Sequence, residues 1–207
     1  MPLLSRPSSA RAPRRRGFNL VEVLVAMAIV GITMGILIPR MKVSPRGVVE
    51  QAALQLAQDL DVARTRAMAT RSLVHVAFTS TPSAQYTSYL DDNRDLLIAE
   101  TDAERDALRG SGTRVLPGGV ALGRGSAPKI PADVANRPFH NPVGFSGMGM
   151  SVRVATVVPN PTRFLVGAQV AYIYLSSVTE PTIAAAVVVP PSGSIRVWRY
   201  SGDAGWQ

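Results

Sequence analysis

The stretch RRRGFNLVEVLVAMAIVGITMGILIP, from Arg14 to Pro39, decides how the rest of the chain is interpreted. From Phe18 to Ile38 it runs for 21 residues, and Glu22 is the one charged side chain among them. A helix that rises ~1.5 Å per residue would cross a hydrocarbon layer about 30 Å thick with that many residues. Residues 18–38 are therefore predicted to form a membrane-spanning helix.

Five arginines and no acid precede the apolar run, within residues 1–17. Such an excess of basic residues holds its side in the cytoplasm, so the remainder of the chain is expected outside it. A secretory signal peptide has a shorter apolar region, roughly 7–15 residues, and a small-residue cleavage site. Here Pro39, Arg40 and Lys42 follow instead. The pattern predicts a retained anchor in the cytoplasmic membrane.

Glu22 is the anomalous residue of this run. A carboxylate at the centre of a spanning helix costs ~2.5–3.5 kcal/mol on insertion scales. Glu22 lies only one turn from the start, so its side chain could reach the head groups. The alternative is a cationic partner, because a paired buried charge is much less costly than an unpaired one. The residues alone leave both interpretations open.

The segment RRGFNLVE, from Arg15 to Glu22, resembles the processing site of type IV pilins and type II secretion pseudopilins. The resemblance implies that a prepilin peptidase cuts after Gly17 and methylates the new amine of Phe18. Residues 1–17 would then be a basic leader peptide. It also implies that Glu22 pairs with the N-terminal amine of a neighbouring subunit in a filament. Glu22 would be an assembly residue, and Asn19 stands where threonine is commoner in the family.

An amphipathic helix is predicted after Gly47. Its apolar residues recur at spacings of three and four and define one stripe: Val49, Ala52 or Ala53, Leu56, Leu60, Ala63 and Ala67. Polar residues, Asp59 and Arg64 among them, are expected on the other faces. Pro39 and Pro45 lack a backbone donor, so the helix should kink or loosen there. Residues 39–72 are thus predicted to continue the N-terminal helix as its amphipathic second half.

The segment LAQDLDVARTRAMATRSLVHVAF, from Leu56 to Phe78, resembles the minor pilins and pseudopilins of the GspH/FimT type. In that family a Leu-x-x-x-Leu-x-x-Ala-Arg-x-x-Ala helix runs into a first strand. The matching residues are Leu56, Leu60, Ala63, Arg64 and Ala67. The resemblance covers residues 14 to about 78 and implies a pilin-like α+β fold, in which a long N-terminal helix packs on a C-terminal antiparallel β-domain.

Residues 73–207 are predicted to form that β-rich globular domain, because short apolar runs alternate with turns rich in Gly and Pro. The predicted strands are 73–79, 85–90, 113–122, 151–157, 163–175, 183–189 and 194–200. Alternation in the last of them places Ile195, Val197 and Arg199 on one face. Arg196, Trp198 and Tyr200 fall on the other face.

Catalytic chemistry finds little support in the sequence. The chain has no cysteine, so disulfides and thiolate nucleophiles are excluded. His75 and His140 are the two histidines, and neither lies in a motif with a nucleophile or paired carboxylates. The glycine-rich segment from Gly144 to Gly149 lacks the Gly-x-Ser-x-Gly spacing of a nucleophile elbow. We predict no catalytic residue and no cofactor.

A calcium loop is suggested by the alternation of Asp91, Asn93 and Asp95. Leu96 occupies the position of the turn glycine, however, and no glutamate stands at the twelfth position. A solvated acidic loop is the favoured interpretation, with no metal.

Charge is unevenly distributed along this chain of formal net charge +8. Residues 50–108 carry ten acids against five arginines, whereas residues 109–207 carry nine basic residues against Asp133, Glu180 and Asp203. Arg and Lys supply most non-specific nucleic-acid affinity, and aromatic rings stack on bases. Arg196, Trp198 and Arg199 are therefore candidate DNA-binding residues, and some members of the family are linked to DNA uptake. The alternative is a solvated face with Trp198 anchored in a core.

The sequence as a whole predicts a minor pilin or pseudopilin. It would be anchored in the cytoplasmic membrane with its C-terminal domain outside, and would then join a type IV pilus or a type II secretion pseudopilus near the tip. Its expected partners are other subunits, the prepilin peptidase and the membrane. One alternative is a DNA-binding minor pilin at a pilus tip that acts in natural transformation. The other is an enzyme with an uncleaved anchor.

Overall fold

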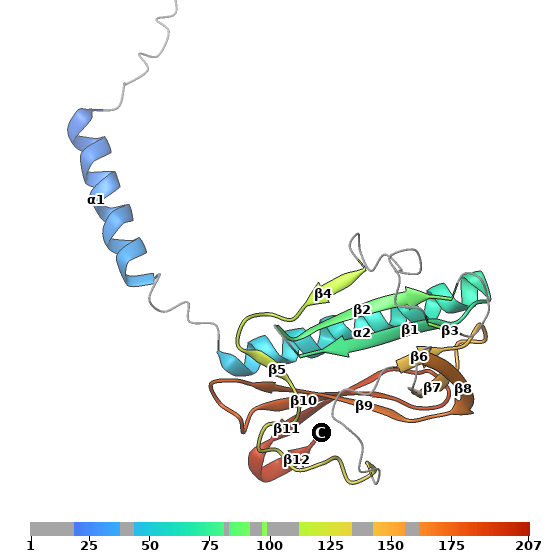
Figure 1. Ribbon diagram of the computed structural model, residues 1–207. Helices are drawn as coiled ribbons and strands as arrows, with labels where there is room; N and C mark the ends of the chain where they lie inside the picture. The colour runs from blue at the N-terminus through green and yellow to red at the C-terminus, as the bar shows by residue number, and fades with distance from the viewer. Residues whose placement is uncertain are drawn as a thin grey trace, which may run out of the picture. The chain divides into compact units, whose positions relative to one another are not determined.

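The computed structural model describes residues 19–37, 44–80, 83–91, 97–98, 112–133, 143–155 and 162–207. The chain divides into two compact units, Met1–Lys42 and Val43–Gln207. The first contains the helix α1 (Leu20–Leu37), and the second contains the helix α2 (Pro45–Thr70) and the strands (Figure 1). Each unit is considered by itself below.

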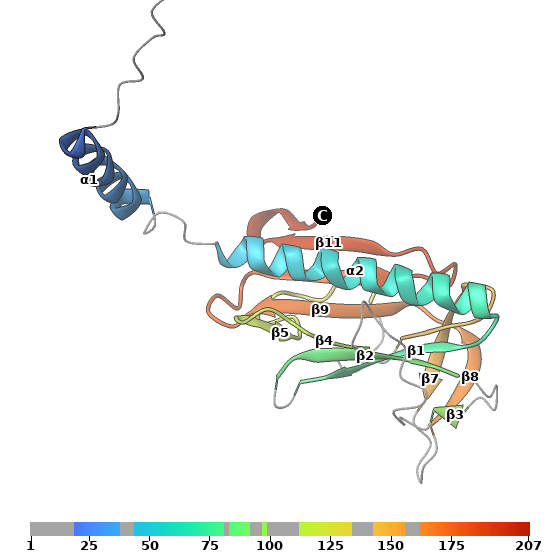
Figure 2. The same ribbon diagram turned by 90° about the horizontal axis from the view of Figure 1, so that it is seen from above.

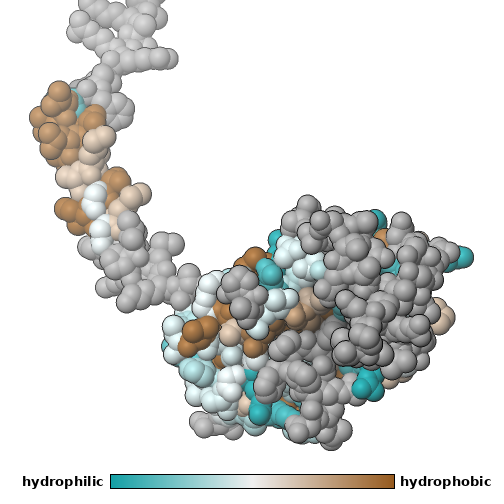
Figure 3. All heavy atoms as spheres, viewed as in Figure 1, coloured by the Kyte–Doolittle hydropathy of each residue, from teal (hydrophilic) through white to brown (hydrophobic). Residues whose placement is uncertain are grey.

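Helix α1 is apolar on all sides. It starts after Asn19, whose carbonyl accepts the N–H groups of Glu22 and Val23 at 2.9 and 3.2 Å. Large apolar side chains are exposed around the helix, with Leu20 at 78% and Met27 at 72%. Figure 3 shows them as brown spheres along most of its length. A helix of this kind has no polar face to turn toward water, so it requires an apolar environment.

Within the part of the chain that the structure describes, no helix meets the length and hydropathy needed to cross a bilayer. Phe18 and Ile38, the ends of the span predicted from the sequence, lie outside the described residues. That span stays a prediction.

Helix α2 has a defined start. The Ser44 hydroxyl caps it by accepting the N–H of Gly47 at 3.2 Å, and Pro45 occupies the first turn. Proline is favoured there because its fixed φ suits a helix and its missing N–H is not needed. The residues buried along α2 include the whole predicted stripe: Val49, Ala52, Ala53, Leu56, Asp59, Leu60, Ala63 and Ala67. The apolar stripe is confirmed, and the helix itself begins at Pro45.

The strands after α2 form two antiparallel sheets. One has the order β3-β8-β7-β6-β1-β2-β4 and the other the order β12-β11-β10-β9-β5. Their bounds are β1 Val74–Thr79, β2 Gln85–Leu90, β3 Leu97–Ile98, β4 Thr113–Val115, β5 Val120–Leu122, β6 Val143–Phe145, β7 Ser151–Ala155, β8 Thr162–Ala168, β9 Ala171–Ser177, β10 Ala184–Val189, β11 Arg196–Ser201 and β12 Gly205–Trp206. The α+β class with antiparallel pairing is confirmed.

The buried face of α2 lies against both sheets. It contacts β1 and β6 of the larger sheet and β5, β9, β10 and β11 of the smaller one. Figure 2 shows the helix running along the length of the strands. Four of its buried residues are alanines, so strand residues such as Phe145, Ile173 and Val187 can pack close to the helix axis. One core joins the helix to both sheets.

Two predicted strands are wrong because each is divided between the sheets. Residues 113–122 form β4 in the larger sheet and β5 in the smaller one. Between them the carbonyl of Pro117 accepts the N–H of Val120 at 3.1 Å, which turns the chain. Residues 163–175 likewise form β8 and β9, which are separated at Gln169 and Val170. In both cases the chain crosses from one sheet to the other, which hydropathy does not reveal.

Asp59 was expected on a polar face of α2, but it is buried, with 1% of its surface exposed. Its Oδ2 accepts the Tyr86 hydroxyl at 2.7 Å and lies 3.4 Å from Nε of Arg114. Tyr86 belongs to β2 and Arg114 to β4, so the carboxylate ties the helix to one edge of the larger sheet. Hydrogen bonds and an opposite charge make its burial tolerable.

Asp59→Ala should lower the free energy of unfolding of residues 43–207 by about 1–3 kcal/mol, because the Tyr86 hydroxyl loses its buried acceptor and Arg114, whose side chain is 28% exposed, loses its carboxylate. Urea denaturation followed by circular dichroism measures this. Asp61→Ala is the matched control on the exposed part of the same helix, with an expected change within about 0.5 kcal/mol. Equal effects of the two substitutions would contradict the role given to Asp59.

Candidate functional site

Glu22 lies in the first turn of α1, where its side chain is exposed. The Oδ1 of Asn19 accepts the N–H of Val21 at 3.4 Å, so a polar side chain precedes the helix at the position of a cap. A negative charge in the first turn also interacts favourably with the partial positive charge of a helix N-terminus. The two predicted processing residues, Gly17 and Phe18, lie outside the described residues.

The surroundings of Glu22 on its own helix are apolar. Residues one turn further along, Val25 and Ala26, carry no charge, and α1 contains no basic residue. Side chains three and four positions apart are the neighbours that could pair on a helix. A cationic partner for Glu22 must therefore come from outside α1.

Strand β11 carries the three candidate DNA-binding residues, and its two faces separate them. Arg199 lies opposite Ala185 and faces α2, with its Nε 3.7 Å from Oε2 of Glu50. Trp198 lies opposite Ala186 and packs on the other face, against the cluster of Ile130, Tyr174 and Val188. Arg196 is exposed and shares the face of Trp198 by strand alternation.

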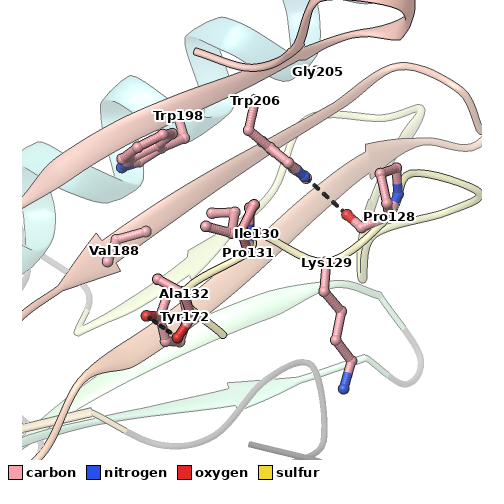
Figure 4. A pocket seen from close by; sticks show the side chains of 10 residues that line it. All are labelled: Pro128, Lys129, Ile130, Pro131, Ala132, Tyr172, Val188, Trp198, Gly205 and Trp206. Carbon is pink, nitrogen blue, oxygen red and sulfur yellow. Dashed lines mark hydrogen bonds between the residues drawn. The ribbon is translucent and has the colours of Figure 1, made fainter. Parts of the chain in front are cut away.

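The face of β11 that carries Trp198 borders a pocket of about 450 Å³ (Figure 4). Trp198 and Trp206 stand on one side, and the segment from Pro128 to Ala132 forms the opposite wall. The Trp206 indole N–H donates to the carbonyl of Pro128 at 2.9 Å. Tyr174, which packs in the same cluster as Ile130 and Val188, has a raised pKa because it is buried and donates its hydroxyl to Asp133 at 2.8 Å.

Arg64 has a role that sequence reasoning missed. It was expected on a polar face of α2, yet its Nε donates to the carbonyl of Gly149 at 2.9 Å and its terminal nitrogen to that of Ser192 at 3.3 Å. These carbonyls belong to the turns before β7 and β11, so one side chain fastens a turn from each sheet. Gly193 has φ 76°, and a Cβ there would strike the Gly149 carbonyl. In the sequence, the glycines at 149 and 193 were the one sign that the backbone of these two turns approaches other groups closely.

His75 is buried in β1, with 2% of its surface exposed, and its ring stacks on Tyr89 with centroids 6.1 Å apart. Burial lowers the pKa of His75 to about 3, because the charged imidazolium would lose its hydration. The histidine is therefore a neutral core residue at physiological pH. His140 lies outside the described residues.

The calcium hypothesis can be examined only at Asp91, which is buried after β2 and whose N–H donates to the carbonyl of Leu73 at 2.9 Å. Asn93 and Asp95 lie outside the described residues. Among the side chains that the structure does describe, no group of three or more His, Asp or Glu residues could hold a metal ion.

Comparison with known families bears on the N-terminal part. Residues 12–38 match the prokaryotic N-terminal methylation motif. This motif is the prepilin-type signal, and it supports the class of type IV pilins and pseudopilins. It favours a structural subunit over an enzyme and implies processing by a prepilin peptidase. No curated protein and no solved structure matches the chain.

His75 should make stability depend on pH. Its pKa is about 3 when folded and about 6.5 when unfolded, so the unfolded state binds more protons between these values. The free energy of unfolding is therefore expected to be highest above pH 6.5 and to decrease as the pH falls toward 3. The expected loss in the free energy of unfolding between pH 6.5 and 5 is about one kcal/mol per pH unit. Urea titrations at several pH values give the free energy of unfolding as a function of pH. Its dependence on pH should be weaker for His75→Phe, whereas Asp61→Asn should keep the wild-type dependence. The same pH dependence in the wild type and both variants would refute the role given to His75.

Proposed function

We propose that this chain is a minor pilin or pseudopilin of the GspH/FimT type, a subunit of a type IV pilus or a type II secretion pseudopilus. The observation that carries the proposal is the methylation motif over residues 12–38, with Glu22 one turn into an apolar helix. The subunit is first held in the cytoplasmic membrane by residues 18–38, with its globular unit outside. A prepilin peptidase removes residues 1–17 and methylates Phe18.

Assembly uses α1 as the central packing element. Its apolar surface needs an apolar environment at every stage. A bilayer provides one, and neighbouring copies of the same kind of helix provide another. When the subunit passes from the membrane into the filament, the burial of its apolar side chains is retained. The hydrophobic effect thus opposes release of the subunit into water but not its transfer between these two environments.

Glu22 supplies what the apolar contacts lack, a preferred axial position. Apolar side chains pack at many registers, whereas an unpaired buried carboxylate is costly and a paired one is tolerated. Cleavage after Gly17 creates a new amine at Phe18, four residues from Glu22. The amine of a neighbouring subunit is the cation that α1 itself does not contain. Pairing between subunits would therefore select one stagger of the helices.

The GspH/FimT assignment draws support from α2. Leu56, Leu60, Ala63 and Ala67 of the motif are buried, and its arginine, Arg64, fastens turns of both sheets. These contacts give the motif a structural reason, since they position the β-domain on the helix. The globular unit would then provide surfaces that contact neighbouring subunits.

DNA binding in natural transformation stays a prediction. The exposed Arg196 beside Trp198 favours it, since a cation and an aromatic ring share one face. Arg199 would not belong to the same contact, because it faces α2 and Glu50. The basic bias of residues 109–207 would still attract a polyanion over longer distances.

The mature chain should begin with N-methylated Phe18. Intact-protein mass spectrometry of the subunit, purified from cells with an active prepilin peptidase, measures this directly. Gly17→Val should retain the leader, because the glycine precedes the cut, whereas Pro7→Ala, upstream of the residues that match the motif, should not. A native chain that keeps residues 1–17 would refute the proposed function.

Glu22→Ala should still be inserted and processed but should enter filaments about tenfold less, because the neighbouring amine would be buried without a carboxylate. The ratio of subunit in sheared filaments to subunit in membranes measures incorporation. Asp61→Asn removes an exposed carboxylate from α2 and serves as the control, with normal incorporation expected. Normal incorporation of Glu22→Ala would argue against the pairing role while leaving the class intact.

A further inference from the structure

The pocket beside Trp198 lies on the face of the smaller sheet that is turned away from α2. Trp198 and Trp206 line one side of it, Pro128 and Pro131 belong to the opposite wall, and Val188 is also among the lining residues (Figure 4). Its volume of about 450 Å³ lies in the range of ligand sites. An antiparallel sheet can leave this face to solvent, with polar side chains. Here aromatic and aliphatic residues occupy it.

The polar atoms in the walls already have partners within the chain. The Trp206 indole N–H donates to the carbonyl of Pro128 at 2.9 Å, and the Tyr172 hydroxyl donates to that of Ala132 at 3.0 Å. A polar ligand would lose its water in this pocket without gaining equivalent hydrogen bonds, which is costly. An apolar group would pay no such cost. The pocket is therefore suited to aliphatic or ring-shaped hydrocarbon surface.

Charge at the rim adds a second requirement. Arg196 lies directly opposite Val188 in the sheet and is exposed on the same side as the pocket. An occupant that places a carboxylate next to its apolar group would meet this guanidinium. The fitting surface is therefore apolar, with one acid close by.

The turn between β9 and β10 has this composition. Val178 is 62% exposed, and Glu180 and Pro181 beside it are also exposed. Glu180 is one of three acids in residues 109–207. Of the other two, Asp133 accepts the Tyr174 hydroxyl, and the side chain of Asp203 lies outside the described residues. An acid next to exposed apolar residues is thus unusual in this basic half.

The turn is fixed to its own chain. The Val178 N–H donates to the carbonyl of Gly119 at 2.9 Å, and the Ser126 N–H donates to that of Pro181 at 2.9 Å. The Glu180 N–H donates to the Ser177 hydroxyl at 3.1 Å. These bonds hold the turn in a defined conformation on its own chain. They also pre-order it for a second molecule, so little conformational entropy is lost on docking.

We propose that the β9–β10 turn of one copy docks into the Trp198 pocket of a second copy. Val178 and Pro181 lie against Trp198 and Trp206, and Glu180 lies beside Arg196. A turn and a pocket at different places on the surface make a heterologous contact. The inference rests on the proposed function for one point only, that copies of the subunit share one membrane before assembly.

Cross-linking between two differently tagged full-length chains in detergent tests the contact, and the absence of native cysteines makes the labels specific. One chain carries Val178→Cys and the other Ala132→Cys, at the pocket wall. A short bismaleimide should join them as a mixed dimer. Met148→Cys replaces Val178→Cys in the control, because Met148 is 78% exposed in the turn between β6 and β7. A yield no higher than this control would overturn the proposal.

A charge exchange tests the orientation without altering the core. Glu180→Arg should reduce the cross-linking rate roughly 3- to 10-fold, because it places two guanidinium groups together. Adding Arg196→Glu to the chain that carries the pocket should restore the rate to within about twofold. Both residues are exposed, so the variants should keep the wild-type circular dichroism spectrum. Failure of the second change to rescue the first would contradict the proposed pairing.

Nucleic acid is the competing occupant, and fluorescence separates the two. Both tryptophans of the chain border the pocket, so indole emission reports on this site. Quenching by oligothymidylate without a specific cross-link would overturn docking between copies and assign the pocket to DNA. A specific cross-link in a chain that keeps its leader would refute the filament function while leaving the contact in place. Normal incorporation without the cross-link would refute only the contact.

Discussion

The fold of the globular unit depends on one helix face that packs against two sheets at once. Alanines on α2 let both sheets approach, and the resulting core contains residues from the helix and from strands of each sheet. Without α2 each sheet would expose an apolar face, and the two sheets would have few core contacts in common. The division of the strands follows from this arrangement, because the chain after β4 and after β8 must cross to the other side of the shared core.

Two polar side chains on α2 reinforce this packing in ways that apolar contacts cannot. Asp59 reaches Tyr86 and Arg114 on one edge of the larger sheet, and Arg64 reaches turns of both sheets. Hydrogen bonds depend on direction, whereas apolar burial does not. These contacts therefore define where the strands lie along the helix. The Ala-Arg pair of the sequence motif joins the two kinds of contact, since Ala63 is buried and Arg64 binds the turns.

The two units of the chain differ in the surfaces that they offer for association. The first offers apolar surface interrupted by one carboxylate, which suits association in a membrane or in a packed bundle of helices. The second buries its apolar residues around α2 and has, among its described residues, the aromatic pocket beside Trp198. Assembly through the first unit would be strong but weakly specific, apart from Glu22. Contacts of the second unit are then where subunits could recognise one another.

Much of this was predictable from local patterns. Three features follow from residues that are near one another in sequence: the motif around Glu22, the apolar stripe of α2 and the strand alternation that separates Arg196 from Arg199. Periodicity and charge were enough to predict them. The burial of Asp59, the clamp made by Arg64, the crossing of strands between sheets and the pocket at Trp198 were decided by tertiary structure. Each depends on residues from distant segments meeting, and a polar residue gives no local sign that a partner far along the chain will allow its burial.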